Sequence, residues 1–256
     1  SSLSLFVSIH FQNPVCLNAI NCLFLVTCSK GSRSKNVLSS LINLINSGSM
    51  TKNPPLIQPR VTWGFSLKDL TRSPSILKDN SVMPSLETMT NEVNYYKNAG
   101  GGSIVEVSCI GLRGDANILR QLSEATGVHI IASTGYYLEG SWPDYAHEAT
   151  VDELRKIMVS EYENGIEDTS VRPGIIAEMG TSKITPGEEK MLRAAARASQ
   201  ETGLAVCTHA NAEDRNGIRI VDILTSEGMS PERIILGHLG SNIFEQRVAV
   251  LERFPE

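Results

Sequence analysis

Three residues that can bind a metal ion recur in this sequence at nearly equal intervals. Glu178, His209 and His238 are separated by 31 and 29 residues, and each lies at or near the end of a short apolar run. A strand–helix–strand unit spans about 30 residues. Two imidazoles and a carboxylate are a common ligand set for zinc, and ions held in this way can activate a hydroxide for hydrolysis. The spacing therefore predicts a divalent-metal site with hydrolytic chemistry.

Each of these residues also has a structural interpretation, since a single histidine near a strand end is more often a hydrogen-bonded structural residue than a ligand. The shared interval favours the metal site over three unrelated structural roles. Glu178 adds a second argument, because it lies inside the apolar run GIIAEMG. A carboxylate in such a run needs a partner or a metal ion to offset the cost of its desolvation.

The other histidines, and two cysteines near strand ends, are interpreted as structural. His129 starts its apolar run, and the start of a strand is the stability end of a barrel. His147 lies in the polar segment PDYAHEA, which predicts a solvated loop. Cys109 and Cys207 are expected to be small core thiols, and His10, in the N-terminal segment, supports no site.

Alternating strand and helix patterns place these residues in a fold. Helices are indicated by apolar residues at helical spacing, by glycines at their ends, and by capping boxes at Thr150/Glu153 and Thr185/Glu188. A last helix is expected from about Ser241. Apolar runs that indicate strands span residues 103–108, 128–134, 174–180, 204–210 and 233–240.

Strands of this kind alternating with helices indicate an α/β fold whose parallel sheet is buried on both faces. A doubly wound sheet and a (β/α)₈ barrel both fit the pattern. In either fold the sites lie at the carboxyl ends of the strands, where residues one unit apart converge. The glycines at 100–102 precede the first of these strands, and no G-x-G-x-x-G follows it. This argues against a dinucleotide-dependent oxidoreductase.

Charge divides the chain near residue 69. Residues 1–68 contain no Asp or Glu and carry a net charge of +6, whereas the remainder carries −11. The apolar patch at 15–28 is too short for a membrane span, and no positive charge precedes it as in a secretory signal. We expect residues 1–49 to be a non-native or poorly ordered extension, with a mitochondrial leader as the alternative, and residues 50–256 to form the functional domain.

Composition limits the partners and the compartment. The overall net charge of −5 argues against nucleic-acid binding along a basic face. The sequence contains five cysteines, an odd number, without zinc-site spacing or a disulfide framework. A reducing, cytoplasmic location is therefore expected.

Two segments carry a family resemblance. Residues 165–210, which include AEMG and THA, and the later IILGHLGSN at 234–242 resemble the phosphotriesterase family of the amidohydrolase superfamily, and within it the phosphotriesterase-related branch. AGGGSIVEVS and GVHIIASTGYY add support. The resemblance extends from about residue 85 to the end of the sequence.

The resemblance implies a (β/α)₈ barrel with two divalent metal ions, usually zinc. It assigns Glu178 as the carboxylate that bridges the ions and as a catalytic residue, and His209 and His238 as ligands of the second ion. It places Tyr137, in STGYY, among the aromatic residues that line the substrate pocket. The branch is linked to small N-acyl amides such as N-acetyltaurine.

Other family ligands have no counterpart here. The sequence contains no His-x-His, the motif that holds the first ion, and the aspartate of the last strand is also missing. We therefore expect an incomplete barrel of about five to six βα units that holds at most one ion weakly, with oligomer formation left open.

The predicted function is that of a metal-dependent hydrolase. Through a metal-activated hydroxide it would act on a small ester, amide or phosphoester, and the missing ligands would impair it. The alternative is a non-catalytic pseudo-enzyme or binding protein that retains half of the metal site.

Overall fold

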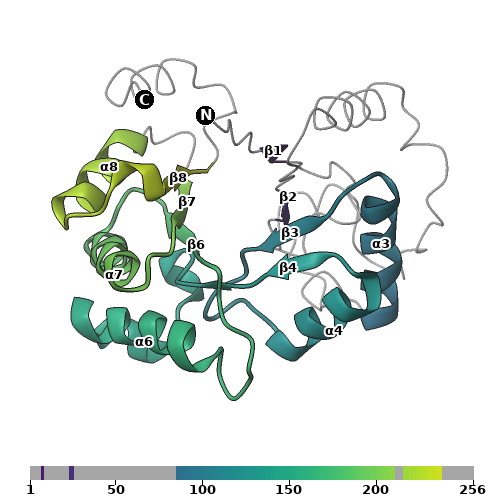
Figure 1. The fold of residues 1–256 in the computed structure, drawn as a ribbon. Coiled ribbons are helices and arrows are strands. Elements are labelled where there is room, and N and C mark those ends of the chain that lie inside the picture. Colours follow the sequence, from purple (N-terminus) through teal and green to yellow (C-terminus); the bar gives the residue numbers. More distant parts are fainter. Residues whose placement is uncertain (1–6, 9–22, 26–84, 211–215, 238–256) are drawn as a thin grey trace, which may run out of the picture. The chain divides into compact units, whose positions relative to one another are not determined.

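The computed structural model describes residues 7–8, 23–25, 85–210 and 216–237 (Figure 1). Two compact units share the chain: one takes in residues 1–104 and 121–130, and the other takes in 105–120 and 131–256. The predicted domain boundary after residue 49, the helix expected from Ser241, and His238 lie outside the described residues.

The first unit is built around one helix and a small sheet. Helix α3 (Leu86–Asn98) begins at Ser85, whose hydroxyl accepts a hydrogen bond from the backbone N–H of Thr88 at 3.2 Å. The sheet has the order β1-β2-β3-β4, and β1 and β2 are antiparallel. Its strands are β1 (Val7–Ser8), β2 (Leu23–Leu25), β3 (Ser103–Glu106) and β4 (His129–Ile131). The core of the unit comprises Val93, Ile104, Leu122 and Val128, of which Leu122 lies in α4 (Ala116–Thr126).

The second unit contains a parallel sheet. Neighbouring strands pair in the order β5-β6-β7-β8, all parallel. The strands are β5 (Ser133–Thr134), β6 (Ile175–Thr181), β7 (Val206–Ala210) and β8 (Ile234–Leu236). All seven residues of β6 are buried, as expected for a strand covered on both faces. The predicted α/β class with parallel strands is confirmed.

Helices connect these strands and lie along one side of them (Figure 1). Helix α7 packs against both α6 and α8. The helical segments are η4 (Glu139–Ser141), α5 (Asp144–Glu148), α6 (Val151–Asn164), α7 (Pro186–Thr202), α8 (Gly217–Ser226) and η5 (Pro231–Arg233).

Both predicted capping boxes are present. Thr150 and Glu153 cap α6, and Thr185 and Glu188 cap α7. The Glu188 side chain is 1% exposed, and its two oxygens accept hydrogen bonds from the backbone N–H groups of Ser182 and Thr185. These bonds offset the desolvation of the carboxylate, so the box also fixes the loop between β6 and α7.

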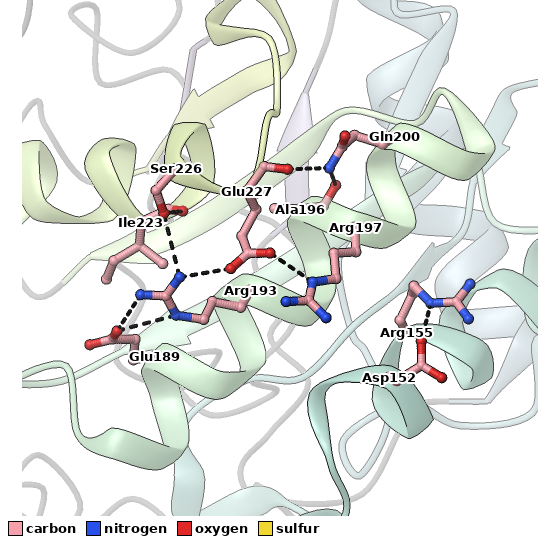
Figure 2. Close-up of polar contacts among 10 residues, drawn as sticks. All are labelled: Asp152, Arg155, Glu189, Arg193, Ala196, Arg197, Gln200, Ile223, Ser226 and Glu227. Atoms are coloured by element: carbon pink, nitrogen blue, oxygen red, sulfur yellow. Dashed lines mark hydrogen bonds and ion pairs between the residues drawn. The ribbon is translucent and has the colours of Figure 1, made fainter.

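Charged side chains join the outer helices (Figure 2). Glu227, at the end of α8, lies 2.7 Å from Arg193 Nη1 and 2.7 Å from Arg197 Nε, both on α7. These guanidinium groups, Arg197 foremost, hold the pKa of Glu227 below its ordinary value. Arg155 of α6 pairs with Asp152 and with Glu201 of α7. Single exposed pairs contribute little, so the network fixes the alignment of the helices more than it adds stability.

Two predicted segments differ from the structure. The run 128–134 divides into β4 and β5 at Ala132, whose carbonyl accepts a hydrogen bond from the Gly174 N–H at 2.9 Å. His147 was expected in a loop, but it lies in the short helix α5, with its side chain exposed. Ala146 is the one buried residue of this five-residue helix, so no apolar periodicity marks it in the sequence. No helix in the part of the chain that the structure describes has the length and apolar character of a membrane span.

Leu192, a core residue of α7, tests the packing of the second unit. Its side chain has no exposed surface, so Leu192→Ala is expected to lower the free energy of unfolding by about 2–5 kcal/mol, measured by urea denaturation. The control Lys156→Ala removes an exposed side chain of α6 and should change it by less than about 0.5 kcal/mol. Equal effects of the two variants would contradict the assignment of Leu192 to the core.

Candidate functional site

Three of the four predicted site residues lie together in the second unit. Glu178 is a residue of β6, His209 is a residue of the neighbouring β7, and Tyr137 follows β5. His209 is paired in register with Gly180, two residues after Glu178. Since the strands are parallel, their carboxyl ends lie at the same edge of the sheet. His238 follows the last described residue, so the structure does not test its predicted position.

Both ring nitrogens of His209 are hydrogen-bonded. Nδ1 lies 3.0 Å from Oε2 of Glu178, and Nε2 lies 3.0 Å from the hydroxyl oxygen of Tyr137. The Tyr137 and His209 rings meet edge to face, with centroids 4.8 Å apart at an interplanar angle of 76°. The Glu178 side chain is 3% exposed and that of His209 is 21% exposed. The three side chains thus form a row of contacts. The buried Glu178 carboxylate contacts the partly exposed His209 imidazole, which in turn contacts the Tyr137 hydroxyl.

The chemistry of these groups assigns the hydrogens. An ionised carboxylate only accepts, so a neutral imidazole in this place donates its Nδ1–H to Glu178. Nε2 then accepts from the hydroxyl of Tyr137. These roles follow from the hydrogen-bond partners rather than from observed hydrogen positions.

The backbone around Tyr137 is held closely against β6. The Tyr137 carbonyl accepts a hydrogen bond from the indole N–H of Trp142 at 2.8 Å, and the Gly180 N–H donates to the Tyr136 carbonyl at 3.1 Å. A Cβ at position 180 would lie 2.6 Å from the carbonyl carbon of Tyr137 and 2.5 Å from the amide nitrogen of Leu138. Only glycine at position 180 therefore permits this approach.

A second glycine brings β8 close to the carboxylate. The Gly237 N–H donates to the carbonyl of Thr208 at 2.9 Å. A Cβ at this position would lie 2.2 Å from that oxygen and 3.7 Å from Oε1 of Glu178. The backbone at Gly237 therefore lies beside Glu178.

Glu106 is a buried acidic residue that the sequence reasoning missed. It is 7% exposed at the end of β3, and its Oε1 accepts a hydrogen bond from the backbone N–H of Ser108 at 2.9 Å. Burial raises the pKa of its carboxyl group. The sequence signal that could have identified Glu106 is the same one that identified Glu178, namely an acidic residue inside an apolar run.

The two cysteines of this region, Cys109 and Cys207, are buried thiols, as predicted. Cys109 is fully buried, and its Sγ donates to the Glu178 carbonyl at 3.8 Å. Burial raises the pKa of its thiol to about 12. The thiol is thus protonated at neutral pH, and a nucleophilic role is unfavourable.

The donors fit part of a metal site. No group of three or more His, Cys, Asp or Glu side chains suited to a metal ion occurs among residues 85–210 and 216–237. Glu178 Oε2 and His209 Nδ1 nevertheless lie 3.0 Å apart, and two ligand atoms of one tetrahedral zinc ion lie about 3.3 Å apart. The described residues therefore bring together two of the three predicted ligands.

The sequence profile of the phosphotriesterase family matches residues 67–253. The chain belongs to the phosphotriesterase family. This confirms the resemblance seen in the AEMG, THA and GHL segments. The family's fold is a (β/α)₈ barrel, and the parallel strands and connecting helices of the second unit form part of such a barrel.

Curated relatives are identical to the chain at about a third of the aligned residues. N-acetyltaurine hydrolase of Danio rerio is 35% identical over 161 residues, 62% of this chain and 46% of that protein. The same enzyme of Xenopus tropicalis is 30% identical over 194 residues, which cover 75% of this chain and 54% of that protein. A phosphotriesterase-related protein of Nematostella vectensis is 35% identical over 162 residues, which cover 63% of this chain and 46% of that protein. The chain spans about half the length of these relatives.

Two solved structures of phosphotriesterase-like proteins resemble the chain. A resiniferatoxin-binding protein from Rhodobacter sphaeroides has a TM-score of 0.70 at 31% identity, covering 78% of this chain and 59% of that one. A phosphotriesterase homology protein from Escherichia coli, complexed with phosphate in its active site, has a TM-score of 0.60 at 28% identity, covering 68% and 70%.

Gly180 tests the geometry of the site. A methyl group at position 180 would meet the backbone of 137–138, so Gly180→Ala is expected to lower the free energy of unfolding by about 1–3 kcal/mol in urea denaturation. Gly140→Ala is the matched control, because a Cβ there would meet nothing within 4 Å. If the two variants are equally stable, the close approach of Tyr137 to β6 is wrong.

Proposed function

We propose that the chain is a metal-dependent hydrolase of the phosphotriesterase-related type. It would hold one divalent ion, zinc by preference, through Glu178, His209 and His238, and would cleave a small amide, ester or phosphoester. The single observation that carries the proposal is the 3.0 Å contact of a buried carboxylate with an imidazole on adjacent parallel strands. A structural ion pair would also explain this contact. The metal site is favoured because the chain belongs to the phosphotriesterase family.

The names of the relatives favour an amide as the substrate. Several curated relatives are N-acetyltaurine hydrolases. We therefore propose a small N-acyl amide with an anionic group as the first substrate to test. The same proposal includes three expectations: residues 50–256 form the functional domain, the protein is cytoplasmic, and Tyr137 lines the substrate pocket.

We propose one bound ion rather than two because of the ligands that the chain offers. The carboxylate and the imidazole are donors that zinc accepts. The sequence contains no His-x-His, the family motif for the other ion. The proposed site therefore has three protein ligands at most, and we expect it to bind its ion weakly.

The residues of the chain would prepare the reaction as follows. A bound divalent ion would polarise the substrate's carbonyl or phosphoryl oxygen and lower the pKa of water. The Glu178 carboxyl group is buried, in a place where electrostatic interactions are stronger than in water. His209 is oriented from both sides by Glu178 and Tyr137. The His209 side chain is 21% exposed, the more exposed of the pair.

Glu178 and His209 are the residues whose replacement tests this function. Glu178→Gln and His209→Asn are expected to weaken zinc binding, measured by chelator competition, by more than the roughly 10- to 100-fold typical of residues that only support a ligand. Hydrolysis of N-acetyltaurine by the zinc-loaded chain should be lost in both. Glu163→Gln, an exposed acidic residue of α6, is the matched control and should change neither.

Two outcomes would contradict the proposal. Unchanged zinc affinity in both variants would remove the site assignment. Two equivalents of zinc bound by the wild-type chain, together with turnover, would show that the one-ion site is wrong.

A binding protein without catalytic activity is the second candidate. The absence of His-x-His and the likeness to a resiniferatoxin-binding protein favour it. Zinc binding without hydrolysis of an N-acyl amide, a lactone or a phosphotriester would support this function over the enzyme.

A further inference from the structure

We propose that Tyr137 is a positioning residue that holds His209 by Nε2 in whichever tautomer the imidazole adopts. This inference rests on the proposed function in one respect, namely that His209 binds a metal ion through Nδ1. It differs from the pocket-lining role implied by the family resemblance, because the Tyr137 hydroxyl is engaged with His209 at 3.0 Å.

The first step of the argument is the position of the hydrogen on the imidazole. With Nδ1 facing a carboxylate, the neutral ring carries its hydrogen on Nδ1, and Nε2 accepts from Tyr137. A ring that binds a metal ion through Nδ1 must instead carry its hydrogen on Nε2. The partner of Nε2 must then change from donor to acceptor.

The second step is the chemistry of the partner. A hydroxyl has one hydrogen to donate and two lone pairs to accept with, and its O–H can rotate. A backbone carbonyl can only accept, and an indole N–H can only donate. Tyr137 can therefore keep its contact with Nε2 in both tautomers, which a carbonyl or an N–H could not do.

The third step is the rigidity of Tyr137. Its carbonyl is bound by the Trp142 indole, and Trp142 is 6% exposed. Its backbone lies against Gly180, and its ring meets the imidazole edge to face. The hydroxyl is thus presented to Nε2 from a fixed backbone, which limits rotation of the imidazole.

The test uses the full chain labelled with ¹⁵N in its histidine rings. Tyr137→Phe removes the hydroxyl and keeps the ring, and Tyr145→Phe is the matched control because the Tyr145 hydroxyl contacts Tyr136 instead. Ring ¹⁵N NMR, with His209 assigned from its missing signals in His209→Asn, reports the tautomer and the bonding of Nε2. Chelator competition reports the zinc affinity, so neither readout is enzymatic activity.

We expect the wild-type chain to carry the hydrogen on Nδ1 without zinc and on Nε2 with it. Tyr137→Phe should shift the His209 Nε2 signal in the metal-free chain and weaken zinc binding about 10- to 100-fold. Tyr145→Phe should do neither. Trp142→Phe, which removes the indole N–H that anchors the Tyr137 carbonyl, should give a smaller change in the same direction and serves if Tyr137→Phe does not fold.

The two proposals can fail separately. If the Nε2 signal and the zinc affinity of Tyr137→Phe both equal those of the wild type, the positioning role is overturned while the metal site stands. If the wild-type chain binds no zinc, the proposed function falls. The Nε2 signal of the metal-free chain then decides the positioning role alone: a shift supports it, and an unchanged signal overturns it.

Discussion

The Glu178 carboxylate lies inside a strand whose every residue is buried, and its Oε2 is 3.0 Å from Nδ1 of His209. A charge in such a place is stable only with a partner, and removal of one member of a buried pair leaves the other uncompensated. That partner, His209, lies on the neighbouring strand β7, so the pairing of β6 with β7 brings the two side chains of the site together. The outer surface of α7 and α8 differs, because its ion pairs are partly exposed and each contributes little.

Small residues allow the structure to close around this pair. Gly180 admits the backbone of Tyr137, and Gly237 admits the backbone beside Thr208. The Cys109 thiol contacts the Glu178 carbonyl from a fully buried position. Side-chain bonds from Glu178 and Tyr137 orient His209, whereas close backbone contacts at Gly180 and Gly237 hold the segments around them, and side-chain chemistry alone does not reveal these backbone contacts.

Much of this arrangement could be predicted from residues with strong local signals. Thr150/Glu153 and Thr185/Glu188 gave the starts of α6 and α7, because a capping box acts within one helical turn. The interval between Glu178 and His209 placed them on adjacent strands, because each βα unit has a similar length. The helix that contains His147 was not predicted, since it is too short for periodicity. The bond between Tyr137 and His209 joins residues 72 apart in the sequence, and no local pattern encodes such a contact.

The claim that Glu178 and His209 act together as ligands is tested most directly by X-ray absorption at the zinc K-edge. The chain loaded with one equivalent of zinc is predicted to show oxygen and imidazole ligands and no sulfur. His209→Asn should lose one imidazole from that spectrum. A wild-type spectrum with sulfur ligands, or one whose imidazole contribution is unchanged in His209→Asn, would contradict the account.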